Sequence, residues 1–242
     1  MSWQTGRLGR QSSHCCVTID LRATAVPDFS YELSHSGLVV GVDEAGRGPW
    51  AGPVVAGAAI LNPATLSAQL VTGLDDSKKL KALKREALLT ALEHSDAVLA
   101  VGLASAAEID ELNILQATLL AMARAVANLG VQPNFALIDG NRVPQNLPCA
   151  AEAVVKGDGK SLSIAAASIV AKVTRDRMMA DLDRIYPGYG WAANAGYGTK
   201  AHQEGLKALG VTAEHRKSFA PIRKILSLEE SKDSTCSTKS PV

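Results

Sequence analysis

The sequence predicts an α/β fold built on a mixed sheet. Short apolar runs of strand length come early in the chain, and segments with apolar residues at helical spacing separate and follow them. Of the 242 residues, 47% are hydrophobic and 20% are charged, which is typical of a folded globular protein rather than a disordered one. This length suits one substantial domain or two small ones.

The elements are expected in the following order. Strands are predicted at residues 38–42, 54–61, 97–104, 135–138 and 153–155. Helices are predicted at residues 81–93, 114–129, 162–185, 200–209 and 220–228. Ser105 and Glu108 have the spacing of a capping box that leads toward the second helix, which should end at Gly130.

Both ends of the chain differ in composition from the middle. Residues 1–36 lack clear periodicity and are interpreted as an N-terminal extension, largely disordered and only loosely ordered from about residue 27. Residues 229–242 form a polar tail. The sequence therefore predicts one folded domain over residues 37–228.

Charge and cysteine content indicate the kind of partner and the cellular compartment to expect. The net charge is +1, but basic residues cluster at 78–85, 156–177 and 216–224, each beside a motif described below. One such cluster is usually a solvated helix face, whereas three favour a polyanionic partner. The four cysteines show no CxxC spacing, which argues against zinc or disulfides and for a reducing cytoplasm, and no apolar stretch reaches membrane-spanning length.

The most informative segment is the run of residues 41–49, GVDEAGRGP. Asp43 and Glu44 follow an apolar strand, where unpaired carboxylates need protons or cations. The turn Gly46-Arg47-Gly48 comes next, in which glycines let the backbone approach a ligand and a guanidinium suits phosphate. This combination indicates a metal site beside a phosphodiester.

Two more acidic residues stand at predicted strand ends, each beside glycine. Asp139 follows the strand at 135–138, and Asp158 lies between a short strand and a long helix. Any one of these acids could simply cap a helix or close a turn. Four carboxylates that converge would repel one another unless divalent cations neutralise them, and all-oxygen ligands select magnesium or manganese over zinc. Such a site suits phosphodiester hydrolysis with two metals.

Residues 154–161 offer an alternative, because VVKGDGKS nearly matches the phosphate-binding GxxxxGK[ST] loop between a strand and a helix. Val154 stands where that loop requires its first glycine, so nucleotide hydrolysis is disfavoured.

His202 and His215 could be general acids, but no nucleophile motif lies near them, and a solvated or helix-packing role is preferred for both.

These residues belong to a longer set of motifs, and on them the chain resembles bacterial ribonuclease HII over about residues 37–225. The motifs occur in the family's order: GVDEAGRGPWAGPVVAGAAIL, DDSKKLK, ASAAEIDELNIL, IDGN, KGDGKSLSIAAASIVAKVTRDR, YPGYGW, GYGTKAH and HRKSFAP. The resemblance implies a ribonuclease H-like fold, with a five-stranded mixed sheet flanked by helices and a helical C-terminal segment.

The resemblance also implies an activity. The family cleaves RNA in RNA–DNA hybrids and cuts on the 5′ side of single ribonucleotides embedded in duplex DNA, leaving 5′-phosphate and 3′-hydroxyl ends. It implies Mn²⁺ or Mg²⁺ as cofactor, two ions during catalysis, and a monomer. A non-catalytic nucleic-acid-binding module that kept the fold is the alternative, and the intact set of four acids argues against it.

Residue roles carry over position by position. Asp43, Glu44, Asp139 and Asp158 match the family's metal-binding acids. Gly46, Arg47 and Gly48 match the turn that reads the ribose 2′-hydroxyl, and Tyr197 matches a tyrosine at the ribonucleotide–deoxynucleotide junction. Lys78 is predicted to contact a phosphate of the substrate. Ala195 replaces the family's usual lysine, which is expected to remove one backbone contact and to weaken substrate affinity.

Overall fold

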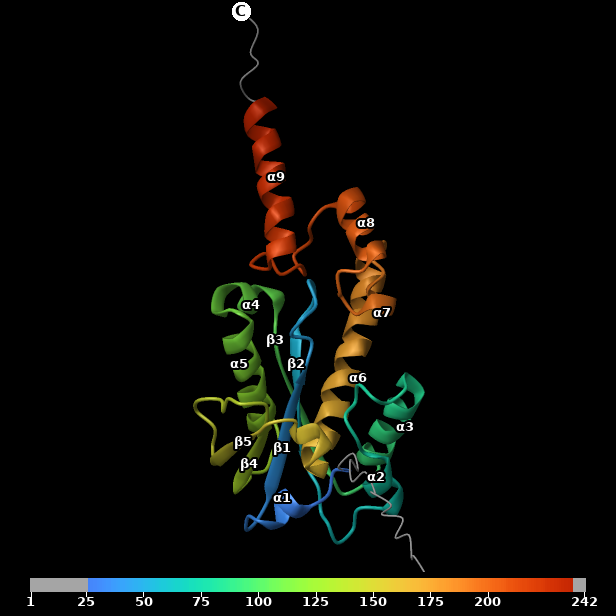
Figure 1. Ribbon diagram of the computed structural model, residues 1–242, viewed down its shortest axis with the longest axis vertical. Coiled ribbons are helices and arrows are strands. Elements are labelled where there is room, and N and C mark those ends of the chain that lie inside the picture. The colour runs from blue at the N-terminus through green and yellow to red at the C-terminus, as the bar shows by residue number, and fades with distance from the viewer. Residues whose placement is uncertain (1–25, 237–242) are drawn as a thin grey trace, which may run out of the picture.

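One five-stranded sheet organises the protein, as the computed structural model shows for residues 26–236 (Figure 1). The strands lie in the order β3-β2-β1-β4-β5. β1 pairs antiparallel with β2, and β2 with β3, whereas β1–β4 and β4–β5 are parallel. The predicted mixed sheet of five strands is therefore confirmed, and its bounds are β1 (Val39–Ala45), β2 (Val54–Ile60), β3 (Val98–Ala104), β4 (Phe135–Asp139) and β5 (Ala150–Val154).

Helices cover the sheet and extend beyond it at one end (Figure 1). In chain order they are α1 (Ser30–Leu33), α2 (Ala68–Gly73), α3 (Ala82–Glu93), α4 (Ala106–Leu112), α5 (Ile114–Ala127), α6 (Leu162–Ile185), α7 (Trp191–Asn194), α8 (Lys200–Leu209) and α9 (Ala220–Cys236). The capping box of Ser105 and Glu108 is present. Asn113, at φ 70°, separates α4 from α5 and accepts hydrogen bonds from the first turn of α5.

The two faces of the sheet pack against different helices. Val40 and Val42 of β1 join the apolar cluster that includes α5, whereas α6 and α3 contribute to the cluster on the other face. Because side chains alternate along a strand, Gly41 and Asp43 face α6, while Glu44 faces α5. The two neighbouring acids of β1 therefore lie on opposite faces.

α6 lies unusually close to the sheet because glycines face it. A Cβ on Gly41 would stand 2.2 Å from the carbonyl carbon of Ser163, and one on Gly57 would stand 2.3 Å from the Ala167 oxygen. The strand positions that meet α6 at these two points therefore require glycine. This close packing places the beginning of α6 directly beside β1.

Residues near both ends of the described chain also pack into the fold. Glu32 of α1 is buried and accepts hydrogen bonds from Ser161 Oγ (2.6 Å) and from the N–H of Ser163 (2.8 Å), at the start of α6. α9 extends to Cys236, eight residues past the predicted boundary at 228. Residues 1–25 of the predicted extension and 237–242 of the predicted tail lie outside the described residues. Within the described part of the chain, no helix has the length and apolar character needed to cross a membrane.

Candidate metal centre

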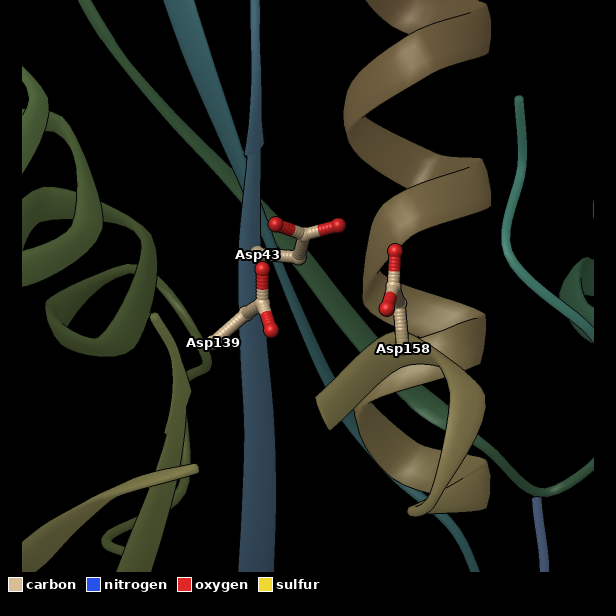
Figure 2. Close-up of side chains that lie close together, drawn as sticks. All are labelled: Asp43, Asp139 and Asp158. Carbon is tan, nitrogen blue, oxygen red and sulfur yellow. The ribbon is translucent and has the colours of Figure 1, made fainter. Parts of the chain in front are cut away.

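Three of the four predicted acids converge in the folded chain. One carboxylate oxygen from each of Asp43, Asp139 and Asp158 lies within 4.8 Å of the other two. Figure 2 shows the three side chains pointing toward a common space between β1 and the start of α6. Asp43 and Asp158 are buried, so little water is available to separate the three charges.

Strand register and a tight turn create this convergence. β1 and β4 pair in parallel as far as Val42 and Ile138, so the next residue of each strand is Asp43 and Asp139 respectively. After β5, Lys156 adopts a left-handed conformation (φ 56°) and a 3₁₀ turn over Gly157–Gly159 presents Asp158. The N–H of Gly157 donates to Asp139 Oδ1 at 2.6 Å and ties that turn to β4.

The position of the first two acids differs from the prediction. Asp43 and Glu44 were expected just beyond a strand, but β1 continues through both to Ala45. The reason is that β2 remains paired with β1 past the point where β4 ends, with Asp43 opposite Gly57. The acids therefore sit on regular strand geometry, which fixes their directions more firmly than a loop would.

Glu44 does not join the group of three. It faces α5, and its carboxylate forms an ion pair with Arg47 at 3.3 Å. With Asp139 and Thr118 of α5 it lines a small cavity on that face of the sheet. Asp139, at the end of β4, therefore belongs to the group of three and also lines this cavity with Glu44.

The electrostatics of the group favour a cation. Burial raises the pKa of Asp43 well above its usual range, and the charges of Glu44 and Asp139 raise it further. Burial, followed by the charge of Asp139, also raises the pKa of Asp158. Burial raises the pKa of Glu44 against the opposing effect of Arg47. Because the ionised carboxylates destabilise one another, a bound positive charge would relieve the repulsion.

The donor chemistry fits a divalent metal. The group offers only carboxylate oxygens, the ligands that magnesium and manganese prefer. Lys78 is a cationic side chain beside the group, with its Nζ 4.0 Å from Asp158 Oδ2, and it is largely exposed. Partial burial opposes its protonation, but Asp43, Asp76 and Asp158 together raise the pKa of Lys78. Its positive charge at the edge of the group would attract an anion bound there.

The predicted recognition residues also lie together. Gly46, Arg47 and Gly48 form the turn that follows β1, and Arg47 and Gly48 are exposed. A Cβ on Gly48 would stand 3.3 Å from Cε1 of Tyr197, so the absence of a side chain lets the turn pack against the tyrosine ring. Tyr197 is half exposed. The exposed tyrosine ring and the exposed backbone turn therefore lie on one surface. The turn begins at Gly46, three residues after Asp43.

His202 and His215 form a buried pair. His202 Nδ1 lies 3.0 Å from the Tyr197 carbonyl, which can only accept, so Nδ1 carries the proton. His202 Nε2 then accepts from Trp191 Nε1 (3.1 Å) and from His215 Nε2 (3.0 Å), and His215 Nδ1 accepts from the N–H of Thr212 (3.0 Å). Both rings are therefore neutral packing groups, in line with the packing role predicted for them.

This pair should make the stability of the fold depend on pH. Burial and the neighbouring His202 lower the pKa of His215 from 6.5 to about 4. The unfolded chain takes up a proton below about pH 6.5 and the folded chain does not, so stability falls as pH falls toward 4, by at most about 1.4 kcal/mol per pH unit for this group. We expect His215→Gln to weaken that pH dependence in urea unfolding between pH 7.5 and 5. Identical profiles for the two proteins would contradict this assignment.

The sequence analysis did not single out two residues that the structure makes functional candidates. Arg175 and Arg216 were counted only among the basic clusters, where a solvated helix face or a polyanion contact was expected. Both are almost completely buried, and within residues 26–236 their side chains donate hydrogen bonds to backbone carbonyls alone. A cationic residue gives no local sequence signal of such burial, because its carbonyl partners come from distant segments.

Comparison with solved structures defines the class of protein. The fold is similar to the ribonuclease H2 of Pyrococcus horikoshii OT3, with a TM-score of 0.66 and 30% identity over 80% of this chain and 99% of that one. It is also similar to Bst-RNase HIII in complex with Mn²⁺, with a TM-score of 0.61 and 21% identity over 80% of this chain and 70% of that one, a likeness in fold alone. Sheet topology and carboxylate cluster together define an endonuclease of the ribonuclease H class.

The family follows from the sequence comparisons. The family model for ribonuclease HII matches residues 40–222. A ribonuclease HII from Jannaschia sp. (strain CCS1) is 57% identical over 201 residues, which cover 83% of this chain and 98% of that protein. The chain belongs to the ribonuclease HII family, whose members are metal-dependent endonucleases acting on RNA in RNA–DNA hybrids.

Proposed function

We propose that this ribonuclease cuts on the 5′ side of single ribonucleotides embedded in duplex DNA, as well as within RNA–DNA hybrids. The products would carry 5′-phosphate and 3′-hydroxyl ends. Two divalent cations, Mn²⁺ or Mg²⁺, would act during catalysis. The protein would work as a monomer in the cytoplasm.

One observation carries the proposal: the recognition turn, Gly46-Arg47-Gly48, directly follows the strand that carries Asp43, one of the three converging acids. Asp43 lies in β1 and Gly46 follows three residues later, with Gly48 packed against Tyr197. A ribose bound on the turn and the ring would place its phosphodiester next to the acids. Because the 2′-hydroxyl is the group that tells RNA from DNA, recognition at this point ties cleavage to a ribonucleotide.

The residues divide the chemistry as follows. Asp43, Asp139 and Asp158 would hold one cation, and the position of Asp139 beside Glu44 would let it share a second. Bound divalent cations supply an activated water and stabilise charge on the leaving oxygen. Lys78 would contact a phosphate of the substrate, which positions the duplex without reading its sequence.

A cleavage assay at nucleotide resolution tests the proposal. We expect a duplex with one ribonucleotide to be cut once, at the phosphodiester 5′ to that residue, with Mn²⁺ or Mg²⁺ present. The same duplex should remain intact in the presence of a chelator, and an all-DNA duplex should remain intact throughout. Cleavage on the 3′ side, or cleavage that needs a run of several ribonucleotides, would contradict the proposed specificity.

A further inference from the structure

Two buried arginines lie directly beneath the recognition turn. Arg175 of α6 is 1% exposed, and Arg216, just before α9, is fully buried. Neither forms an ion pair with a carboxylate in the described part of the chain. Burial lowers the pKa to about 10 for Arg175 and about 9 for Arg216, so both remain cationic at neutral pH. Burying a charge without a counter-ion costs free energy, so the burial of these two arginines calls for a structural reason.

Arg216 holds the turn from inside. Its Nη2 donates to the Gly46 carbonyl at 2.6 Å and its Nη1 to the Arg47 carbonyl at 2.9 Å. Its Nε donates to the carbonyl of Gly52 at 3.0 Å, on the far side of the same connection. The planar guanidinium therefore fixes two successive peptide units in one orientation.

This orientation decides where the amide hydrogens of the turn point. The peptide bonds of the described chain are all trans, so each carbonyl and the N–H of the following residue point in opposite directions. With the Gly46 and Arg47 carbonyls turned inward, the N–H groups of Arg47 and Gly48 are turned outward. Neither N–H has an acceptor among the described residues, and both residues are exposed. Two successive free amides above a buried positive charge form a site for an acceptor oxygen or an anion.

Arg175 links this turn to the segment that carries Tyr197. Its Nη1 donates to the Ala195 carbonyl at 2.9 Å, while its Nε and Nη2 donate to the carbonyls of Pro53 (2.9 Å) and Ala51 (3.2 Å). Its side chain also occupies the space beside Gly46, where a Cβ would stand 1.9 Å from Nε. At position 195 this contact uses only the backbone carbonyl, so it does not require the lysine side chain that the family usually has there.

We propose that Arg216, supported by Arg175, is a positioning residue that aims the Arg47 and Gly48 amides at the substrate's ribose–phosphate chain. The buried charge then acts on the oxygen that these amides bind. This inference rests on the proposed function, because the acceptor oxygen is taken to belong to the embedded ribonucleotide. Two acceptors share this chemistry, the ribose 2′-oxygen and a phosphate oxygen, and the comparison of ribose with deoxyribose separates them.

Binding measurements on the full-length protein test the role. Affinities are measured by fluorescence anisotropy in Ca²⁺, with a duplex that contains one ribonucleotide and with an all-DNA duplex of the same sequence. For Arg216→Lys we expect the preference for the ribonucleotide to fall about tenfold, as for one lost charge-assisted hydrogen bond, with all-DNA affinity changed less than about twofold. Equal weakening for both duplexes would assign the amides to a phosphate and overturn the ribose part of the proposal. Unchanged affinities for both duplexes would overturn all of it.

Controls separate this role from general destabilisation. Arg124→Lys is the matched variant, because Arg124 also donates to a backbone carbonyl, that of Leu103 at 2.8 Å, on the α5 face of the sheet. It should keep the wild-type preference. If Arg216→Lys does not fold, the wild-type protein still decides: the amide NMR signals of Arg47 and Gly48 should shift with the ribonucleotide duplex and stay in place with the all-DNA duplex. A wild-type protein with no ribonucleotide preference would refute the proposed function instead.

Discussion

Replacing Asp43 by asparagine is expected to abolish cleavage and, at the same time, to stabilise the metal-free protein. Asp43 is 2% exposed and belongs to the group of three carboxylates. Bound cations contribute several kcal/mol to hydrolysis of this kind, so we expect kcat/KM on a single-ribonucleotide duplex to fall by about 10³-fold or more. Binding of the duplex in Ca²⁺ should change far less, because the recognition turn and Tyr197 are unaltered.

The gain in stability follows from the same burial. The folded-state pKa of Asp43 is raised above its usual value of 3.8, so its stabilising effect is complete below that pH and is lost as pH rises through the folded pKa. At pH 7.5 Asp43 of the unfolded chain is ionised, so folding of the metal-free wild type carries the free-energy cost of either burying or protonating this carboxylate, a cost that asparagine lacks. Each kcal/mol recovered should raise Tm by about 2–4 °C. Addition of Mn²⁺ should raise the Tm of the wild type but not that of the variant.

Asp181→Asn is the matched control, because it removes a carboxylate that is exposed and paired with Arg184 on α6. It should change neither cleavage nor the Mn²⁺-dependent rise in Tm. Near-native turnover by Asp43→Asn would refute the assignment of this residue to the metal centre. A lower Tm for the metal-free variant would show that hydrogen bonding at this position outweighs the repulsion.

The sequence predicted the sheet well because its strands carry their own signals. β2 and β4 are apolar runs close to the predicted bounds, and α6 follows an apolar pattern that ends before Pro187. β5 begins three residues earlier than predicted, at Ala150, because its pairing with β4 rather than its composition defines it. The start of α5 at Ile114 agrees with the prediction, but α4 was not predicted as a separate helix, since seven residues leave little trace in hydrophobic periodicity.

The candidate site was predicted in part. The spacing of acids and glycines pointed to Asp43, Asp139 and Asp158, which do meet. The different direction of Glu44 depends on β1 continuing as a strand through both acids, and that depends on how long β2 stays paired. The arginines beneath the recognition turn could not be predicted, because α6 contributes Arg175 to carbonyls more than a hundred residues away in the chain.

The second large effect is expected from Gly57→Ala, which adds one methyl group to β2 and alters no side chain proposed to bind metal or substrate. A Cβ at Gly57 would stand 2.3 Å from the Ala167 carbonyl oxygen and 2.9 Å from the Ala171 nitrogen, both backbone atoms of α6. Since backbone cannot rotate away, the helix must move off the sheet. We expect a loss of about 2–3 kcal/mol of stability and a fall in Tm of about 4–12 °C.

Activity should fall as well, because α6 begins directly after the turn that presents Asp158, while Gly57 lies opposite Asp43 in the sheet. A displacement of about 1 Å between catalytic groups can cost about 10²-fold in rate. Gly73→Ala is the control, because a Cβ there meets only the flexible Cδ2 of Leu88, at 2.9 Å. Thermal unfolding and steady-state cleavage of both variants decide the matter: a Gly57→Ala protein with native Tm and native kcat would show that the close approach of α6 does not set the carboxylate geometry.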